Sequence, residues 1–206
     1  MKHLSVLLYL SILAGVCYAQ GDGLQPQPDT LAPADVAAAP APAPASVAKD
    51  LFSPGTFGET LAASVSDQLR HFPSQWGDGV TGGFQKRLAS EYGQVVLGNL
   101  IQSAVQKLHN EDPRYFRRGH GNFFARTFYV IENTLVVHAT DGTRTVSLSL
   151  PAEAYGSWGI ASLWYPTEDR GIGSFFRYGS ANIGVKVAGN FFHEFWPDVK
   201  SAFRHH

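Results

Sequence analysis

Hydrophobic residues recur at helical spacing over most of the chain after residue 55. The first group lies four residues apart and consists of Phe57, Leu61, Val65 and Leu69. This spacing predicts an amphipathic helix from Thr56 to Phe72, which Pro73 ends. A longer pattern predicts a second helix, the longest of the chain, that begins between Val80 and Phe84 and ends at His109. Because each of its four glycines costs about 1 kcal/mol relative to alanine, we expect a neighbouring helix to approach it closely.

A hairpin is predicted between a third and a fourth helix. The third helix begins near Asn122, and its end is ambiguous. Asp141-Gly142 is a strong turn signal, flanked by the apolar residues 135–139 and by alternating polar and apolar residues over 143–150. Ser149, with Pro151 in the first turn, then begins a fourth helix that runs to Trp164.

A fifth helix is predicted from Ile172 to Glu194, and the segment up to Asp198 ends it. Three small residues at four-residue spacing, Ser180, Gly184 and Ala188, would let another helix come close. The fold class is therefore mainly α: a single helical domain of about five helices with one short β-hairpin.

The first 55 residues differ from this domain. Residues 1–19 combine a basic start, an uncharged apolar run and a small residue at Ala19, which is typical of a cleaved export signal that leaves Gln20 as the N-terminus. Lipidation at Cys17 fits less well because Val16 precedes it. Residues 20–55, rich in Pro and Ala, are predicted to be a disordered linker before a helical domain at 56–206.

Composition narrows the classes of function. Cys17 is the only cysteine, so a mature chain without the signal has no disulfide, cysteine nucleophile or thiolate metal site. The part from Thr56 onward has a net charge of +1, which gives no electrostatic basis for nucleic-acid binding. No stretch after the signal is long and apolar enough to be predicted as transmembrane.

The connection between the second and third helices, residues 112–121, has the least ordinary composition. It holds three arginines, two aromatic residues, a histidine and two glycines. Asp112 before Pro113 predicts a helix start, with Asp112 as the N-cap. Gly119 and Gly121 are expected to free the backbone before the next helix.

A set of ordered landmarks extends beyond this connection. They are Asp112-Pro113-Arg114-Tyr115-Phe116-Arg117, Tyr165-Pro166, Asp169-Arg170-Gly171 and Glu194-Phe195-Trp196-Pro197-Asp198. In this order they resemble an uncharacterised family of exported bacterial proteins, and the resemblance covers the folded part without the signal or linker. The resemblance implies a mostly helical envelope protein, and it does not imply any particular activity.

The sequence gives little support for a metal site or for a serine nucleophile. His193-Glu194 lacks the second histidine of a zinc-binding helix, so no metal site is predicted. Ser157 lies one position out of register for a nucleophile elbow and falls in a predicted helix. The acid pairs Glu111-Asp112 and Glu168-Asp169 lie beside helix starts, where carboxylates interact favourably with the helix dipole. We therefore predict no catalytic residues.

The arginines are the best candidates for a binding site. Arg114, Arg117, Arg118 and Arg126, with His120, would suit a phosphate, a carboxylate or an anionic glycan. Aromatic residues including Tyr115 and Trp196 would stack on sugar rings, or lie in the core. The favoured interpretation is structural: Arg114 and Arg170 form ion pairs with Glu194, Asp169 or Asp198, whereas the Arg118 side chain has little importance.

These inferences predict an exported, periplasmic or extracellular protein with a structural or interaction role, acting on an envelope component or a protein partner. No cofactor and no nucleic-acid partner are expected. One alternative is a small glycan- or ester-active hydrolase that uses Asp, Glu, His and Arg side chains near the central connection. Another is a peripheral lipid-binding module that uses the fifth helix.

Overall fold

The computed structural model describes residues 51–112 and 114–204. The predicted export signal, residues 20–50 of the predicted linker, and Pro113 lie outside the described residues. Five α-helices and one two-stranded antiparallel hairpin make up the described part, so the mainly α fold class is confirmed.

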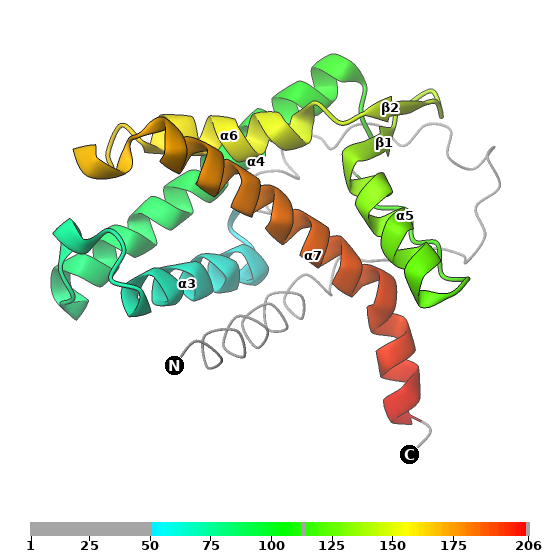
Figure 1. Ribbon diagram of the computed structural model, residues 1–206, viewed down its shortest axis with the longest axis horizontal. Helices are drawn as coiled ribbons and strands as arrows, with labels where there is room; N and C mark the ends of the chain where they lie inside the picture. The colour runs from blue at the N-terminus through cyan, green and yellow to red at the C-terminus, as the bar shows by residue number, and fades with distance from the viewer. Residues whose placement is uncertain (1–50, 113, 205–206) are drawn as a thin grey trace.

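The elements follow one another as α3 (Pro54–Leu69), α4 (Gln85–His109), α5 (Phe123–Leu135), β1 (Val136–His138), β2 (Arg144–Val146), α6 (Ser149–Ala161) and α7 (Ile172–Arg204). Three short helical turns accompany them: η1 (Ser74–Trp76), η2 (Val80–Phe84) and η3 (Thr167–Asp169). Helix α4 packs against both α3 and α6, and α7 packs against α6 and α5 (Figure 1). The C-terminal end of α7 projects beyond the other helices in this view.

Local signals start and stop α3 and α4. The Ser53 side chain accepts a hydrogen bond from the Thr56 N–H, and Pro54 takes the first helical position. Helix α3 begins at Pro54, inside the predicted linker, and it ends at Leu69, three residues before the predicted Phe72. Asn110 ends α4 in the left-handed conformation with a φ of 54°. The predicted second helix is broken at its start, however, because Thr81 and Gly82 have non-helical dihedral angles.

The predicted hairpin is confirmed. Val136 pairs with Val146 and His138 with Arg144, and Gly142 supplies a positive φ of 83° in the turn. The second arm stops at Val146 rather than Leu150, because α6 begins at Ser149.

Helix α6 begins and ends differently from the prediction. Ser149 is its first residue rather than its cap, and the Leu150 N–H instead donates to the Ser147 hydroxyl. The helix ends at Ala161, earlier than the predicted Trp164.

Helix α7 corrects two predictions. It has 33 residues against 25 in α4, so α4 is not the longest helix, and it does not end near Glu194 but continues through Pro197. Proline removes a backbone donor and disrupts the preceding turn. In the turn before Pro197 the Glu194 carbonyl accepts N–H groups from the Arg117 and Arg126 side chains.

Close helix approach occurs at some of the expected glycines and not at others. A Cβ at Gly98 of α4 would lie 3.3 Å from Glu153 Cγ of α6, which confirms an approach there. The close helix approach predicted at the small-residue stripe of α7 is wrong, because Gly184 has nothing within 4 Å of its Cβ position. The close contact on α7 is at Gly179, against the ring of Tyr155.

The core is small and aromatic. Trp158, Ala161 and Tyr165 form its buried centre, and four partly buried aromatic residues pack on it: Phe72, Trp76, Phe175 and Tyr178. Trp158 stacks on Tyr178 with ring centroids 4.0 Å apart. These contacts join the end of α6 to α7 and to the segment after α3.

Helix α3 has its polar face inside. Thr60 and Ser64 are 1% and 0% exposed, whereas Phe57 and Leu69 of the predicted apolar stripe are 54% and 59% exposed. An apolar stripe ordinarily faces the core of its own domain. Helix α3 is therefore inverted relative to that rule.

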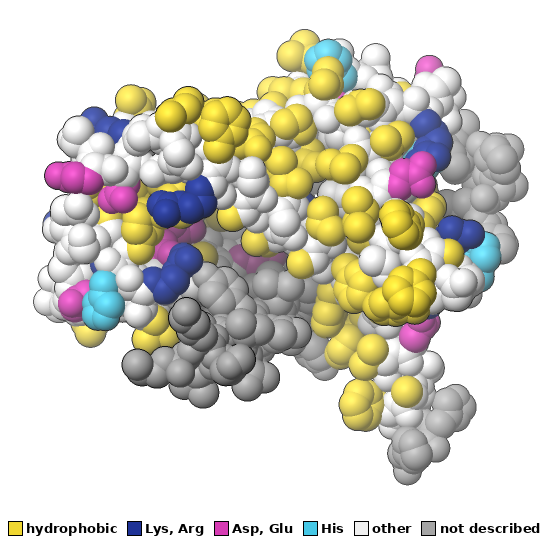
Figure 2. All heavy atoms as spheres, viewed as in Figure 1, with side chains coloured by type: hydrophobic (Ala, Val, Ile, Leu, Met, Phe, Trp, Pro, Cys, Tyr) yellow, Lys and Arg dark blue, Asp and Glu magenta, His cyan; other side chains and the backbone are white. Residues whose placement is uncertain are grey.

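Helix α5 shows the same inversion. It buries Arg126, Asn133 and Thr134, and it exposes five large hydrophobic residues: Phe123, Phe124, Phe128, Ile131 and Leu135. Hydrophobic side chains gather on the face of the molecule formed by α7 and α5 (Figure 2). The described part of the chain thus leaves two extended apolar helix faces uncovered.

Candidate functional site

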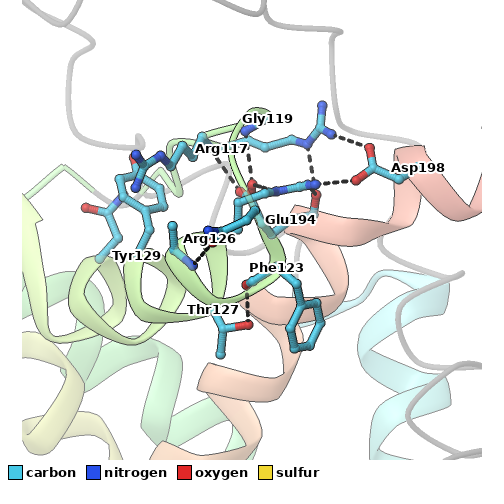
Figure 3. A network of polar contacts seen from close by, with 12 residues as sticks. Arg117, Gly119, Phe123, Arg126, Thr127, Tyr129, Glu194 and Asp198 are labelled. Atoms are coloured by element: carbon cyan, nitrogen blue, oxygen red, sulfur yellow. Dashed lines mark hydrogen bonds and ion pairs between the residues drawn. The ribbon is translucent and has the colours of Figure 1, made fainter.

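The carboxylate of Glu194 on α7 is the centre of the region that the sequence singled out. Its side chain is 0% exposed. It accepts hydrogen bonds from Tyr115 Oη at 3.2 Å, from the backbone N–H groups of Arg118 and Gly119 at 2.9 and 3.0 Å, and from Arg126 Nε at 2.8 Å (Figure 3). Four donors compensate the burial of this charge.

Two arginines also bind the backbone and the next acid of α7. Arg126 Nη2 and Arg117 Nε donate to the Glu194 carbonyl at 2.6 and 3.0 Å. Arg117 Nη2 lies 3.0 Å from Asp198 Oδ1, and Arg126 Nη1 pairs with the other oxygen of Asp198. The Arg126 guanidinium lies over the Phe195 ring, 4.3 Å from its centroid. We call Tyr115, Arg117, Arg126, Glu194 and Asp198 the Glu194 cluster.

Local sequence signals position both sides of this cluster. Asn122 caps α5 by accepting from the Ala125 N–H, which confirms the predicted start and places Arg126 in the first turns. Gly119 adopts a φ of 70°, and its N–H reaches the Glu194 carboxylate. Glycine tolerates this conformation without a steric cost, as expected for that position.

The predicted helix start at Asp112 is wrong. Asp112 precedes an irregular segment, in which its carboxylate accepts from the backbone N–H of Arg114 and pairs with Arg114 Nη2 at 2.6 Å. An acid that bonds the backbone two residues later forms a local turn that competes with helix formation. The Asp112 carboxylate therefore bonds Arg114 within its own segment and does not cap a helix.

The predicted partners of Arg114 and Arg170 are also wrong. Arg114 pairs with Asp112 and not with Glu194, and Arg170 donates to the carbonyls of Tyr165 and Leu163 at 2.8 and 3.2 Å. Ion pairs between the central connection and α7 do exist, but Arg117 and Arg126 form them. The type of interaction was predicted, and its residues were not.

The other candidates lie apart from the cluster. The Arg118 side chain lies over the Tyr129 ring, and His120 is exposed. Trp196 stacks on Phe192 at 4.9 Å. Asp169 ends η3, in the connection between α6 and α7. The described residues contain no group of three or more His, Cys, Asp or Glu side chains that would hold a metal ion.

The electrostatics of the cluster follow from burial. Burial, followed by the negative charge of Glu194, raises the pKa of the Tyr115 phenol well above its ordinary value. Burial, followed by the positive charge of Arg117, lowers the pKa of His193. Tyr115 is therefore a hydrogen-bond donor at neutral pH, and the guanidinium groups of Arg117 and Arg126 are already engaged by Glu194 and Asp198.

Sequence reasoning missed the role of Glu111. Its side chain is buried and accepts from Leu148 N at 2.8 Å, from Ser149 Oγ at 2.6 Å and from Ser147 Oγ at 3.3 Å. Glu111 thus binds the N-terminus of α6, a helix that begins 38 residues later. The sequence showed an acid beside a turn, but it gave no sign of which helix the acid would serve.

Sequence reasoning also missed the polar surroundings of two carboxyl groups, Asp67 of α3 and Glu91 of α4. Asp67 is 7% exposed and Glu91 is half-buried, and burial followed by the charge of Asp67 raises the pKa of Glu91. Tyr165 Oη and Gln94 Nε2 donate to Glu91 Oε1 at 3.4 and 3.2 Å, and Arg70 Nη2 donates to Asp67 at 2.5 Å. The helical spacing of Thr60, Ser64 and Asp67 is the signal that places these polar residues on one face of α3.

Comparisons with models of known protein families, with curated proteins and with solved structures give no match. The resemblance to exported envelope proteins therefore stays a prediction. None of the helices in residues 51–204, Pro113 aside, combines the length and hydrophobicity needed to cross a membrane.

Proposed function

We propose that this chain is an exported envelope protein that acts by binding an envelope component through its uncovered apolar helix faces. The observation that carries the proposal is the inverted polarity of α3 and α5. Their buried positions are largely polar, and their exposed positions are largely apolar. Extended apolar surface on a soluble protein marks a site where a protein or a membrane binds.

The Glu194 cluster supports a structural role for the arginines. Arg117 and Arg126 are bonded to α7, and Arg114 is bonded to Asp112. These contacts favour ion pairs that stabilise the fold over a binding site for a phosphate or an anionic glycan. The hydrolase alternative has less support, because Glu194 and Asp112 are both bonded to arginines.

Lipid binding stays a second candidate because α7 also exposes large hydrophobic side chains. Phe176, Val185 and Phe203 are all exposed along it. A peripheral contact of α7 and α5 with a membrane surface would cover them.

Site-specific photocrosslinking in the native cell tests the interaction. A photoreactive residue at Phe128, on the exposed face of α5, should capture a protein or a lipid, whereas one at the exposed Lys107 of α4 should capture neither. The identity of the adduct separates a protein partner from a lipid. Equal yields at both positions, or no adduct at Phe128, would contradict the proposal.

Export is tested separately by mass spectrometry of the protein purified from its native source. The mature chain should begin at Gln20 and be recovered from the envelope or the medium. A cytoplasmic protein that retains Met1 would show that residues 1–19 are not a cleaved signal.

A further inference from the structure

A continuous apolar surface runs from α5 onto the C-terminal end of α7. Phe124, Phe128 and Ile131 are exposed along α5. The Phe123 ring joins them to α7, because its centroid lies 5.7 Å from that of Phe124 and 5.3 Å from that of Phe195. Figure 2 shows hydrophobic side chains gathered over both helices. We call this apolar area the α5–α7 surface.

The α5–α7 surface continues on the end of α7, which projects beyond the other helices in Figure 1. Phe195, Val199 and Phe203 follow one another at four-residue spacing, which places them on one side of the helix. Val199 and Phe203 are both exposed. Because this end of α7 projects from the domain, its apolar side is buried only by something outside the described part of the chain.

The charges around this surface are positive on balance. The acids of α5, of residues 114–122 and of the last turns of α7 are Glu132, Glu194 and Asp198. Each of them is paired with an arginine. Two further cations lie beside the surface: the Arg118 side chain lies over Tyr129 of α5, and Lys200 is exposed next to Val199. The apolar surface therefore has a rim of net positive charge.

We propose that the α5–α7 surface lies on a phospholipid membrane with anionic headgroups. This inference rests on the proposed function and names the envelope component that the chain binds. A helix that lies in the membrane interface combines aromatic and aliphatic residues on one face with cations beside them. The anionic headgroups attract the rim, and the phenylalanine rings enter the boundary between headgroups and acyl chains.

A second copy of the chain fits the same surface less well. Two copies that paired through it would bring two positive rims together, and like charges across an interface oppose association. An anionic membrane removes the same apolar side chains from water and supplies the opposite charge. The sign of the rim therefore favours the membrane over self-association.

Sedimentation of the mature chain, from Gln20 onward, with lipid vesicles tests the proposal. One set of vesicles is an equimolar mixture of phosphatidylglycerol and phosphatidylcholine, and the other is phosphatidylcholine alone. The wild-type chain should bind the mixed vesicles at least about tenfold more tightly, because each cation near an anionic surface strengthens binding about fivefold. The absence of binding, or equal binding to both sets, would overturn the proposal.

Substitution on α5 locates the surface that binds. Phe124 and Phe128 are both 74% exposed, so the variant Phe124→Ser/Phe128→Ser removes little packing from the domain. It should bind the mixed vesicles at least about tenfold more weakly than wild type, because two rings no longer leave water. Leu108→Ser removes an exposed apolar side chain from α4 and should bind as wild type. Equal losses in the two variants would overturn the assignment to α5 and α7.

A pair of lysine variants tests the rim and leaves every apolar side chain in place. Lys200→Gln should weaken binding to the mixed vesicles about fivefold. Lys107→Gln removes an exposed lysine at the end of α4 and should leave binding unchanged. This pair decides the question if the double phenylalanine variant does not fold, and equal effects of both substitutions would contradict the proposal.

Failure of this inference differs from failure of the proposed function. If the chain does not bind vesicles but a photoreactive residue at Phe128 captures a protein in the cell, the inference is wrong and the proposed function stands. If the chain instead self-associates, and Phe124→Ser/Phe128→Ser abolishes this, a second copy covers the surface and the inference is likewise wrong. If the chain binds no vesicles and the residue at Phe128 captures nothing, both are wrong.

Discussion

Replacing Arg126 by alanine is the sharpest perturbation of the Glu194 cluster. The Arg126 side chain is 8% exposed and bonds the carboxylate of Glu194, the carbonyl of Glu194 and the carboxylate of Asp198. Removing one partner of a buried ion pair typically costs about 3–5 kcal/mol, because the other charge stays buried. Glu194 would keep the Tyr115 hydroxyl and two backbone donors. We therefore expect Arg126→Ala to lower the free energy of unfolding by about 3 kcal/mol, the lower end of that range.

Thermal unfolding followed by circular dichroism measures this loss. For a domain of this size about 3 kcal/mol corresponds to a fall in Tm of roughly 6–12 °C. Arg118→Ala is the matched control, because Arg118 contributes its backbone N–H to Glu194 and its side chain lies over Tyr129. Arg118→Ala should lower the free energy of unfolding by less than about 1 kcal/mol. If both variants shift Tm equally, the Arg126 ion pairs do not stabilise the fold as argued.

Two other predictions concern helix contacts and are measured by the same unfolding experiment. Glu111→Ala should lower the free energy of unfolding by about 2–4 kcal/mol, because the buried donors at the start of α6 lose their shared acceptor. An unchanged Tm would contradict this role of Glu111. Gly179→Ala should destabilise by about 1–3 kcal/mol, because its Cβ would lie 2.0 Å from Tyr155 Cδ1. Gly184→Ala, with nothing within 4 Å, should instead gain up to about 1 kcal/mol, and equal effects at both positions would refute the packing argument.

The number and type of elements could be predicted because local chemistry sets them. Asn122 caps α5, Asp141-Gly142 turns the hairpin, and Pro73 follows the end of α3. Each signal acts through the backbone within a few residues, so it is legible in a single sequence. Pro197 is also a local signal, but the helix end that it predicted is wrong, because α7 continues through it to Arg204.

The orientation of the helices could not be predicted in this way. The spacing of Phe57 and Leu61 correctly shows that they share a face of α3, but it does not show that this face points outward. Likewise the sequence predicted that arginines of the central region pair with Glu194. It could not choose between Arg114 and Arg126, because that choice depends on how residues almost 70 positions away are placed.

The Glu194 cluster also has a consequence for the order of folding. Arg117 and Arg126 leave the ribosome long before Glu194 and Asp198, so neither arginine can find its partner while the chain is being made up to α6. The central connection should therefore settle only once the second half of α7 has been synthesised. A chain truncated before Glu194 would lack the two carboxylates on α7 that Arg117 and Arg126 bind. We expect such nascent or truncated chains to be open around α5 and readily degraded.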